Sequence, residues 1–213
     1  MKRRAAAMLF LAAMVMITGC EAKNDVSWTP DRTALQADET GTLTETLIDT
    51  FDQTYYSSSE LESMIDEAVR TYNAEQGAEA VTKVSYTSQD GQVELVLQYR
   101  SGQDMARFNN EKAFNGSMLG AQMEGYQFDC NFRRVADGVT SEEIISNEEP
   151  LSHKEYQVLI CNPVYTVEVP GKIAYVSENA VTTAEKIAAA RTGTVDQADS
   201  TEDQKLLYVI YEY

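Results

Sequence analysis

The sequence is poor in the residues on which most metal and nucleophilic chemistry depends. Its 213 residues include one His and three Cys, which leave few ingredients for a zinc site or a histidine-dependent triad. Basic residues are also scarce, because 17 Lys and Arg stand against 34 Asp and Glu and give a formal charge of −17. Nucleic-acid binding relies on clustered Lys and Arg, so we expect no nucleic-acid partner.

Common catalytic and cofactor-binding motifs are missing as well. The chain has no glycine-rich phosphate loop, no His-Glu-x-x-His, no calcium loop and no Cys-x-x-Cys. The run 115–120 misses the Gly-x-Ser-x-Gly nucleophile elbow by one position, so Ser117 is predicted to cap a helix. His153 lies in a polar segment and is predicted to be exposed. We therefore predict no cofactor, no metal site and no catalytic residue.

The first twenty residues carry the strongest signal. Lys2, Arg3 and Arg4 precede thirteen apolar residues, 5–17. As a helix this run spans roughly 20 Å, which is short of the ~30 Å of a hydrocarbon core. It is therefore predicted to be the apolar part of a signal peptide rather than a membrane span.

The end of this run, Ile17-Thr18-Gly19-Cys20, resembles the lipobox of bacterial lipoproteins. The resemblance implies that Cys20 takes a diacylglycerol thioether and that signal peptidase II cuts between Gly19 and Cys20. A thiolate is the nucleophile that thioether formation needs, and two acyl chains hold a protein stably on a membrane. The alternative is a plain secretory signal with an incidental Cys.

Processing at this site would change the charge of the protein. Removal of residues 1–19 leaves 14 basic and 34 acidic residues, a formal charge of −20. Such a domain is repelled by an anionic lipid surface. An acidic surface usually serves solubility, and a cationic partner or calcium is the alternative.

The predicted organisation is a signal peptide over 1–19, a lipidated Cys with a flexible tether over 20–32, and a single extracytoplasmic domain over 33–213. A two-lobed domain divided near 135–155 is the alternative. Cys130 and Cys161 fall on predicted strands, where they form either a disulfide, which an extracytoplasmic compartment permits, or two buried thiols.

Hydrophobic periodicity predicts one long amphipathic helix. Its apolar positions follow helical spacing at Leu61, Met64, Ile65, Ala68, Val69 and Tyr72. Ser59 with Glu62 makes a capping box, and Gly77 supplies a left-handed end. Shorter helices are predicted over 103–108 and 117–124.

Alternation and turn residues predict the strands. They fall at 33–51 as a hairpin, 81–87, 93–99, 126–132, 156–161, 165–169, 173–177 and 206–213, with a brief strand or turn at 113–116. Glu45 shares the apolar face of its strand with Leu43 and Leu47. Asp90-Gly91 is typical of a type I′ turn, and Pro170-Gly171 suits a type II turn.

Two segments near the C-terminus are less regular. Residues 184–191 have helical composition with strand as the alternative, and 192–204 are predicted to be a mobile loop. Together these patterns predict an α+β fold with a largely antiparallel sheet of about seven or eight strands, one long amphipathic helix and short helices.

A second resemblance covers most of the mature chain. It is carried by Tyr55 to Leu61, Met64-Ile65, Tyr72-Asn73, Phe114-Asn115-Gly116 and Val169 to Ser177. These runs look like those of uncharacterised small lipoproteins of Gram-positive anaerobes, a family with no known activity. The resemblance therefore implies a location and a domain but no mechanism.

We expect a lipid-anchored cell-surface protein with a non-enzymatic binding or accessory role. Its predicted membrane partner is the lipid bilayer, reached through the diacylglycerol on Cys20. The alternative is an extracytoplasmic hydrolase that acts on glycan or peptide with acidic residues.

Overall fold

The computed structural model describes residues 28–53, 55–192 and 205–213, which form 13 strands and four helices. The α+β class and the largely antiparallel pairing are confirmed, but these strands form two sheets rather than one. Gly19 and Cys20 lie outside the described residues, as does the predicted loop 192–204 apart from Thr192. No helix in the described part is both long and apolar enough to cross a membrane.

The first sheet has seven strands in the order β11-β12-β9-β1-β2-β4-β3. Their bounds are β1 Ala34–Ala37, β2 Leu43–Thr50, β3 Val81–Gln89, β4 Gln92–Tyr99, β9 Thr166–Glu168, β11 Ala180–Ala184 and β12 Ile187–Ala190. The β3–β4 turn has positive φ at Asp90 and Gly91, as a type I′ turn requires. Among the described strands, β1 and β9 form the one parallel pair, and a division of the chain near 135–155 would separate these partners.

The second sheet has six strands in the order β5-β8-β13-β10-β6-β7. Their bounds are β5 Phe114–Ser117, β6 Phe132–Ala136, β7 Val139–Thr140, β8 Gln157–Cys161, β10 Lys172–Ser177 and β13 Leu207–Glu212. The predicted closing strand is confirmed, and β13 lies inside the sheet between β8 and β10.

Four helices accompany the sheets: α1 Ser58–Gln76, α2 Gly102–Asn109, α3 Met118–Met123 and α4 Glu148–Ser152. The long helix is confirmed with Gly77 at its left-handed end, but its N-cap is Ser57 rather than Ser59. Met64, predicted to lie on its core face, is 69% exposed. Ser117 caps α3 as predicted, accepting a hydrogen bond from the Gly120 amide at 3.0 Å.

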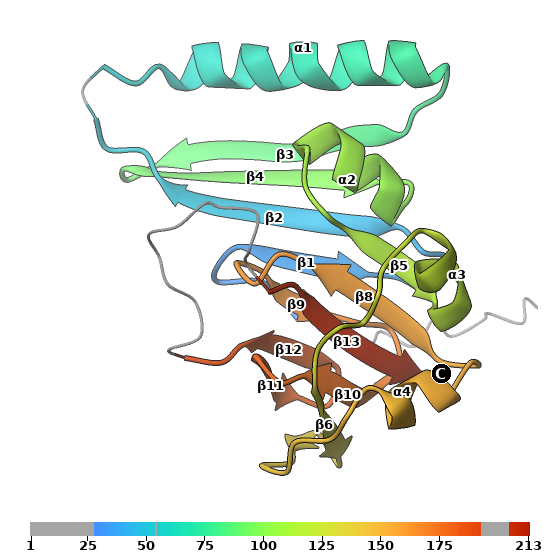
Figure 1. Cartoon of the computed structure of the whole chain (residues 1–213). Coiled ribbons are helices and arrows are strands. Elements are labelled where there is room, and N and C mark those ends of the chain that lie inside the picture. The colour runs from blue at the N-terminus through green and yellow to red at the C-terminus, as the bar shows by residue number, and fades with distance from the viewer. Residues whose placement is uncertain (1–27, 54, 193–204) are drawn as a thin grey trace, which may run out of the picture.

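The main core lies between the two sheets. Leu35 and Leu97 of the first sheet share it with Leu159 and Val209 of the second. The α1 helix packs against the β3 end of the first sheet, where Figure 1 shows it running above β3. A second cluster, which includes Phe132 and Tyr208, covers the other face of the six-stranded sheet together with α3. Strands β8 and β13 are therefore buried on both faces.

Three local predictions were wrong or incomplete. Residues 126–131 form a loop rather than a strand, because Phe128 adopts a left-handed backbone with φ +54°. Gly171 does not have the positive φ of a type II turn; a Cβ there would lie 2.1 Å from the Glu212 carbonyl oxygen, so close strand approach explains the glycine. Of the two alternatives for 184–191, the strand is correct.

Candidate functional site

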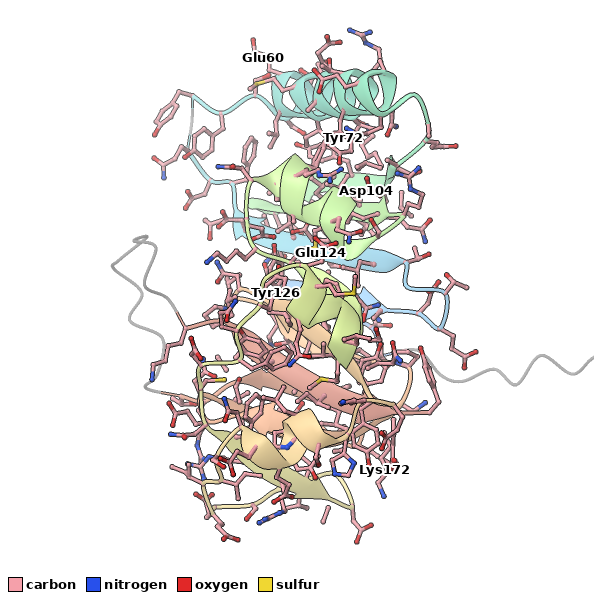
Figure 2. The ribbon with its side chains drawn as sticks, turned by 45° about the vertical axis from the view of Figure 1, so that its right-hand side comes forward. Glu60, Tyr72, Asp104, Glu124, Tyr126 and Lys172 are labelled. Atoms are coloured by element: carbon pink, nitrogen blue, oxygen red, sulfur yellow. The ribbon has the colours of Figure 1, made fainter. Side chains whose placement is uncertain are left out.

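A groove of about 520 Å³ lies beside α2 and is lined in part by residues of the second core cluster. Three segments line it: α2 with the residues that follow it, the loop 124–130, and the stretch that leads into β13. Figure 2 shows Glu124 and Tyr126 of the loop where α2 and α3 approach each other. We call this cavity the α2 groove.

Aromatic rings form the apolar part of the α2 groove. Phe114 and Tyr126 lie 5.7 Å apart between ring centroids, and Phe128 and Tyr208 lie 5.1 Å apart, both in tilted packing. Burial raises the pKa of the Tyr126 hydroxyl. Such a lining with a few polar groups is typical of small-ligand sites.

The groove also gathers basic side chains, although the protein is strongly acidic. Arg107, Lys112 and Lys205 line it together with the acids Glu124 and Asp129. Lys205 is paired with Glu178 at 2.9 Å, outside the lining. Arg107 and Lys112 are exposed and form no ion pair with any residue that the structure describes.

Backbone geometry places these side chains. Ser101 caps α2 by accepting from the Asp104 amide at 3.1 Å, and Asn110 ends the helix in a left-handed conformation. A Cβ on Gly102 would lie 2.7 Å from the Asn115 amide nitrogen, so glycine lets α2 approach β5 closely. The helix therefore holds Arg107 at the rim of the groove.

The loop wall contains a strained residue. A positive φ is a genuine outlier for a bulky aromatic such as Phe128. Its carbonyl accepts hydrogen bonds from the Cys130 amide at 2.8 Å and from the Asn147 side chain at 2.9 Å, and its ring is fully buried. Strain of this kind clusters at functional sites, where surrounding contacts maintain it.

Cys130 lines the groove, whereas Cys161 lies at the end of β8 in the main core. Both are free thiols in the structure, and they belong to different core clusters. Of the two, Cys161 is buried and Cys130 is half-buried. Burial raises the pKa of Cys130 to about 12 and also raises that of Cys161, so both thiols are unreactive near neutral pH.

The segment that follows α2 takes part in a polar network around two acids, Glu45 and Glu111, which we call the carboxyl pair. Tyr165 Oη lies 2.5 Å from Glu45 Oε1 and 2.9 Å from Glu111 Oε1, so its single hydroxyl joins the two. Tyr99 donates to Glu45 at 2.6 Å, and the Asn109 amide lies within 3.2 Å of both Glu45 oxygens. Within the described residues neither acid has an ion-pair partner.

Proton counting decides how this network is satisfied. Tyr165 carries one hydroxyl proton and cannot donate to both acids at once. A proton on either acid resolves the Tyr165 contacts, because the protonated acid donates to Tyr165 and Tyr165 donates to the other acid. Burial raises the pKa of Glu111, which favours Glu111 as the protonated acid, and the hydrogen bonds that Tyr165 and Asn109 can donate to its charged form partly oppose the rise. Neither acid lines the α2 groove.

His153 is half-buried rather than exposed. Its ring stacks on Tyr156 with centroids 4.6 Å apart, and its Nε2 lies 3.2 Å from the Tyr175 hydroxyl. In the described part of the chain, no three His, Cys, Asp or Glu side chains come together as a potential metal site.

Comparisons with known proteins leave the site to be argued from its own geometry. No family model matches the sequence, and no curated protein and no solved structure matches it either. Sequence reasoning missed Arg107 and Lys112. The one signal was weak: three basic residues, Arg100, Arg107 and Lys112, fall within 13 residues of an acidic chain.

Proposed function

We propose that this chain is a lipid-anchored extracytoplasmic protein whose folded part binds a small ligand in the α2 groove without catalysing a reaction. The lipobox-like run at Gly19-Cys20 supports the anchor. The groove supports the binding role, because it combines aromatic walls, basic side chains without ion-pair partners and a strained loop residue, Phe128.

The anchor is tested by labelling cells with a radioactive fatty acid. The wild-type protein should carry label and remain with the membrane, whereas Cys20→Ala should lose the label. Cys130→Ala is the matched control, because Cys130 lies in the folded domain outside the lipobox-like run and its loss should leave the label unchanged. Continued labelling of Cys20→Ala would reject the anchor.

The binding site is tested by filling the groove. Gln103 is exposed on α2 and lines the groove, whereas Gln122 is exposed on α3 and does not. In a screen of small molecules by saturation-transfer nuclear magnetic resonance, Gln103→Trp should abolish the signal of each bound molecule. Gln122→Trp should leave it unchanged. Equal binding by both variants would place the ligand elsewhere and reject the groove.

A hydrolase is the second candidate, on the observation that Glu124 and Asp129 line the same groove. Two carboxylates on one cavity are the minimum for glycoside hydrolysis. Glu124→Gln and Asp129→Asn separate the candidates, because a hydrolase would lose turnover of glycan or peptide with either change. A binding protein would show no turnover before or after the substitution.

A further inference from the structure

We propose that the ligand of the α2 groove is an amphiphilic anion, with an aromatic or compact apolar body and a phosphate, sulfonate or carboxylate head. The inference rests on the proposed binding function and names the class of ligand. Arg107 and Lys112 would bind the head, while Tyr126 and Phe114 would contact the body.

The first step is the charge of the side chains that line the groove. The whole chain has two acidic residues for each basic one, yet the lining has three basic and two acidic side chains. Lys205 is paired with Glu178, so Arg107 and Lys112 are the two lining cations without an ion-pair partner among the described residues. Glu124 accepts a hydrogen bond from Gln103 at 3.0 Å, which partly satisfies that carboxylate within the protein.

The second step is that the two cations are unused by the protein. Elsewhere basic side chains are taken up by the abundant acids: Lys83 pairs with Glu62 and Arg100 with Asp104. Four exposed basic residues lack such a partner among the described residues, namely Arg107, Lys112, Lys154 and Lys186. Two of these four stand on the same wall of one groove.

The third step is the chemistry of the two cationic groups, the Arg107 guanidinium and the Lys112 ammonium. A guanidinium offers a fork of donors that matches phosphate, sulfonate and carboxylate geometry, and an ammonium adds a point charge. Arg107 lies in the last turn of α2, and Lys112 follows the left-handed residue Asn110 that turns the chain. Tyr126 of the loop 124–130, which is half-buried, supplies apolar contact that an inorganic ion cannot use.

The test uses the full-length protein, extracted with its anchor in a non-ionic detergent, and isothermal titration calorimetry. Four probes separate charge from apolar body: 1-naphthyl phosphate, 1-naphthol, 1-naphthylmethylammonium and inorganic phosphate. Blank titrations into detergent alone correct for partition into micelles. We expect naphthyl phosphate to bind at least tenfold more tightly than each of the other three.

Substitutions then locate the head. Arg107→Gln and Lys112→Gln should each weaken naphthyl phosphate binding at least fivefold, while Arg107→Lys and Lys112→Arg should recover part of the loss. Lys186→Gln is the matched control, because Lys186 is also exposed and also without an ion-pair partner among the described residues. It should change the affinity less than twofold. Unchanged circular dichroism and melting temperature show that each variant is folded.

The outcomes separate this inference from the function on which it rests. Equal binding of naphthol and naphthyl phosphate, with both lost in Gln103→Trp, overturns the anionic ligand but keeps the groove as a binding site. Tighter binding of 1-naphthylmethylammonium than of naphthyl phosphate would also overturn the anionic ligand and keep the groove as a binding site. Loss of affinity in Lys186→Gln as large as in Arg107→Gln overturns the location of the head. No binding of any probe, together with no effect of Gln103→Trp in the screen, overturns both.

Discussion

The carboxyl pair makes a definite prediction about stability and pH, tested by Glu111→Gln. The pKa of Glu111 is raised in the folded protein, so folding favours its protonated form. The associated stability is fully present below the ordinary glutamate pKa of about 4.3. It is lost as the pH rises through the raised pKa of the folded state. The substituted amide stays neutral at every pH and keeps a donor for Tyr165, so the variant should escape that loss.

The magnitude follows from the geometry. Both acids contact Tyr165 Oη, at 2.5 and 2.9 Å, so the two contacting carboxylate oxygens are at most 5.4 Å apart. With an effective dielectric constant of about 20, two unit charges at that distance repel by roughly 3 kcal/mol. Because Glu111 is only half-buried, solvent screening lowers this figure. We expect Glu111→Gln to gain about 1–3 kcal/mol over wild type at pH 8 and almost nothing at pH 4.

Urea unfolding followed by far-ultraviolet circular dichroism, from pH 4 to pH 9, measures the difference. Glu185→Gln is the control, because Glu185 is exposed and outside the network; its stability should follow the wild type at every pH. Glu45→Gln removes the same repulsion, so the double variant should gain less than the two single gains together. Parallel pH profiles for wild type and Glu111→Gln would refute the assignment of the proton to Glu111.

Other contacts lead to three further predictions. Without reductant, the lipidated protein should react with iodoacetamide at both Cys130 and Cys161 after denaturation and at neither in the native state, as measured by mass spectrometry. Alkylation of only one thiol, or of none, after denaturation would contradict two free thiols. Gly171→Ala should cost more than about 2 kcal/mol in urea unfolding because its Cβ meets the Glu212 carbonyl, whereas Gly41→Ala, with open space but φ +89°, should cost about 1 kcal/mol. Asn73→Ala removes three hydrogen bonds to Ala80 and Val81, so the amide hydrogens of α1 should exchange faster than in the control variant Thr71→Ala. Equal exchange in the two variants would refute a role of Asn73 in docking the helix.

Local patterns predicted most elements because their signals are local. The β3–β4 hairpin depends on Asp90-Gly91, and α1 on helical spacing closed by Gly77. The pattern at 126–132 was misleading, because burial does alternate there while the backbone turns at Phe128. Alternating burial in a loop and in a strand looks the same in a sequence.

The division into two sheets could not be predicted from these patterns. It depends on pairings such as β1 with β9, which bring Leu35 beside Val167 across more than a hundred residues. Glu45 illustrates the same limit. It lies on the apolar face of its strand, and its carboxylate accepts hydrogen bonds there from Tyr99, Tyr165 and Asn109, which come from three separate segments.

The α2 groove and the carboxyl pair share one short segment, residues 107–112. This connection explains why Lys112 forms no ion pair with the acid beside it in the sequence. Glu111 is the acid adjacent to Lys112, but its side chain turns inward to Tyr165 and is held there by the network on the sheet. Asn109 turns inward as well, to Glu45. The network therefore holds the carboxylate adjacent in sequence to Lys112 away from that lysine, and Arg107 and Lys112 are exposed. The inward turn of Glu111 thus accounts for the absence of an ion pair between Lys112 and the acid beside it in the sequence.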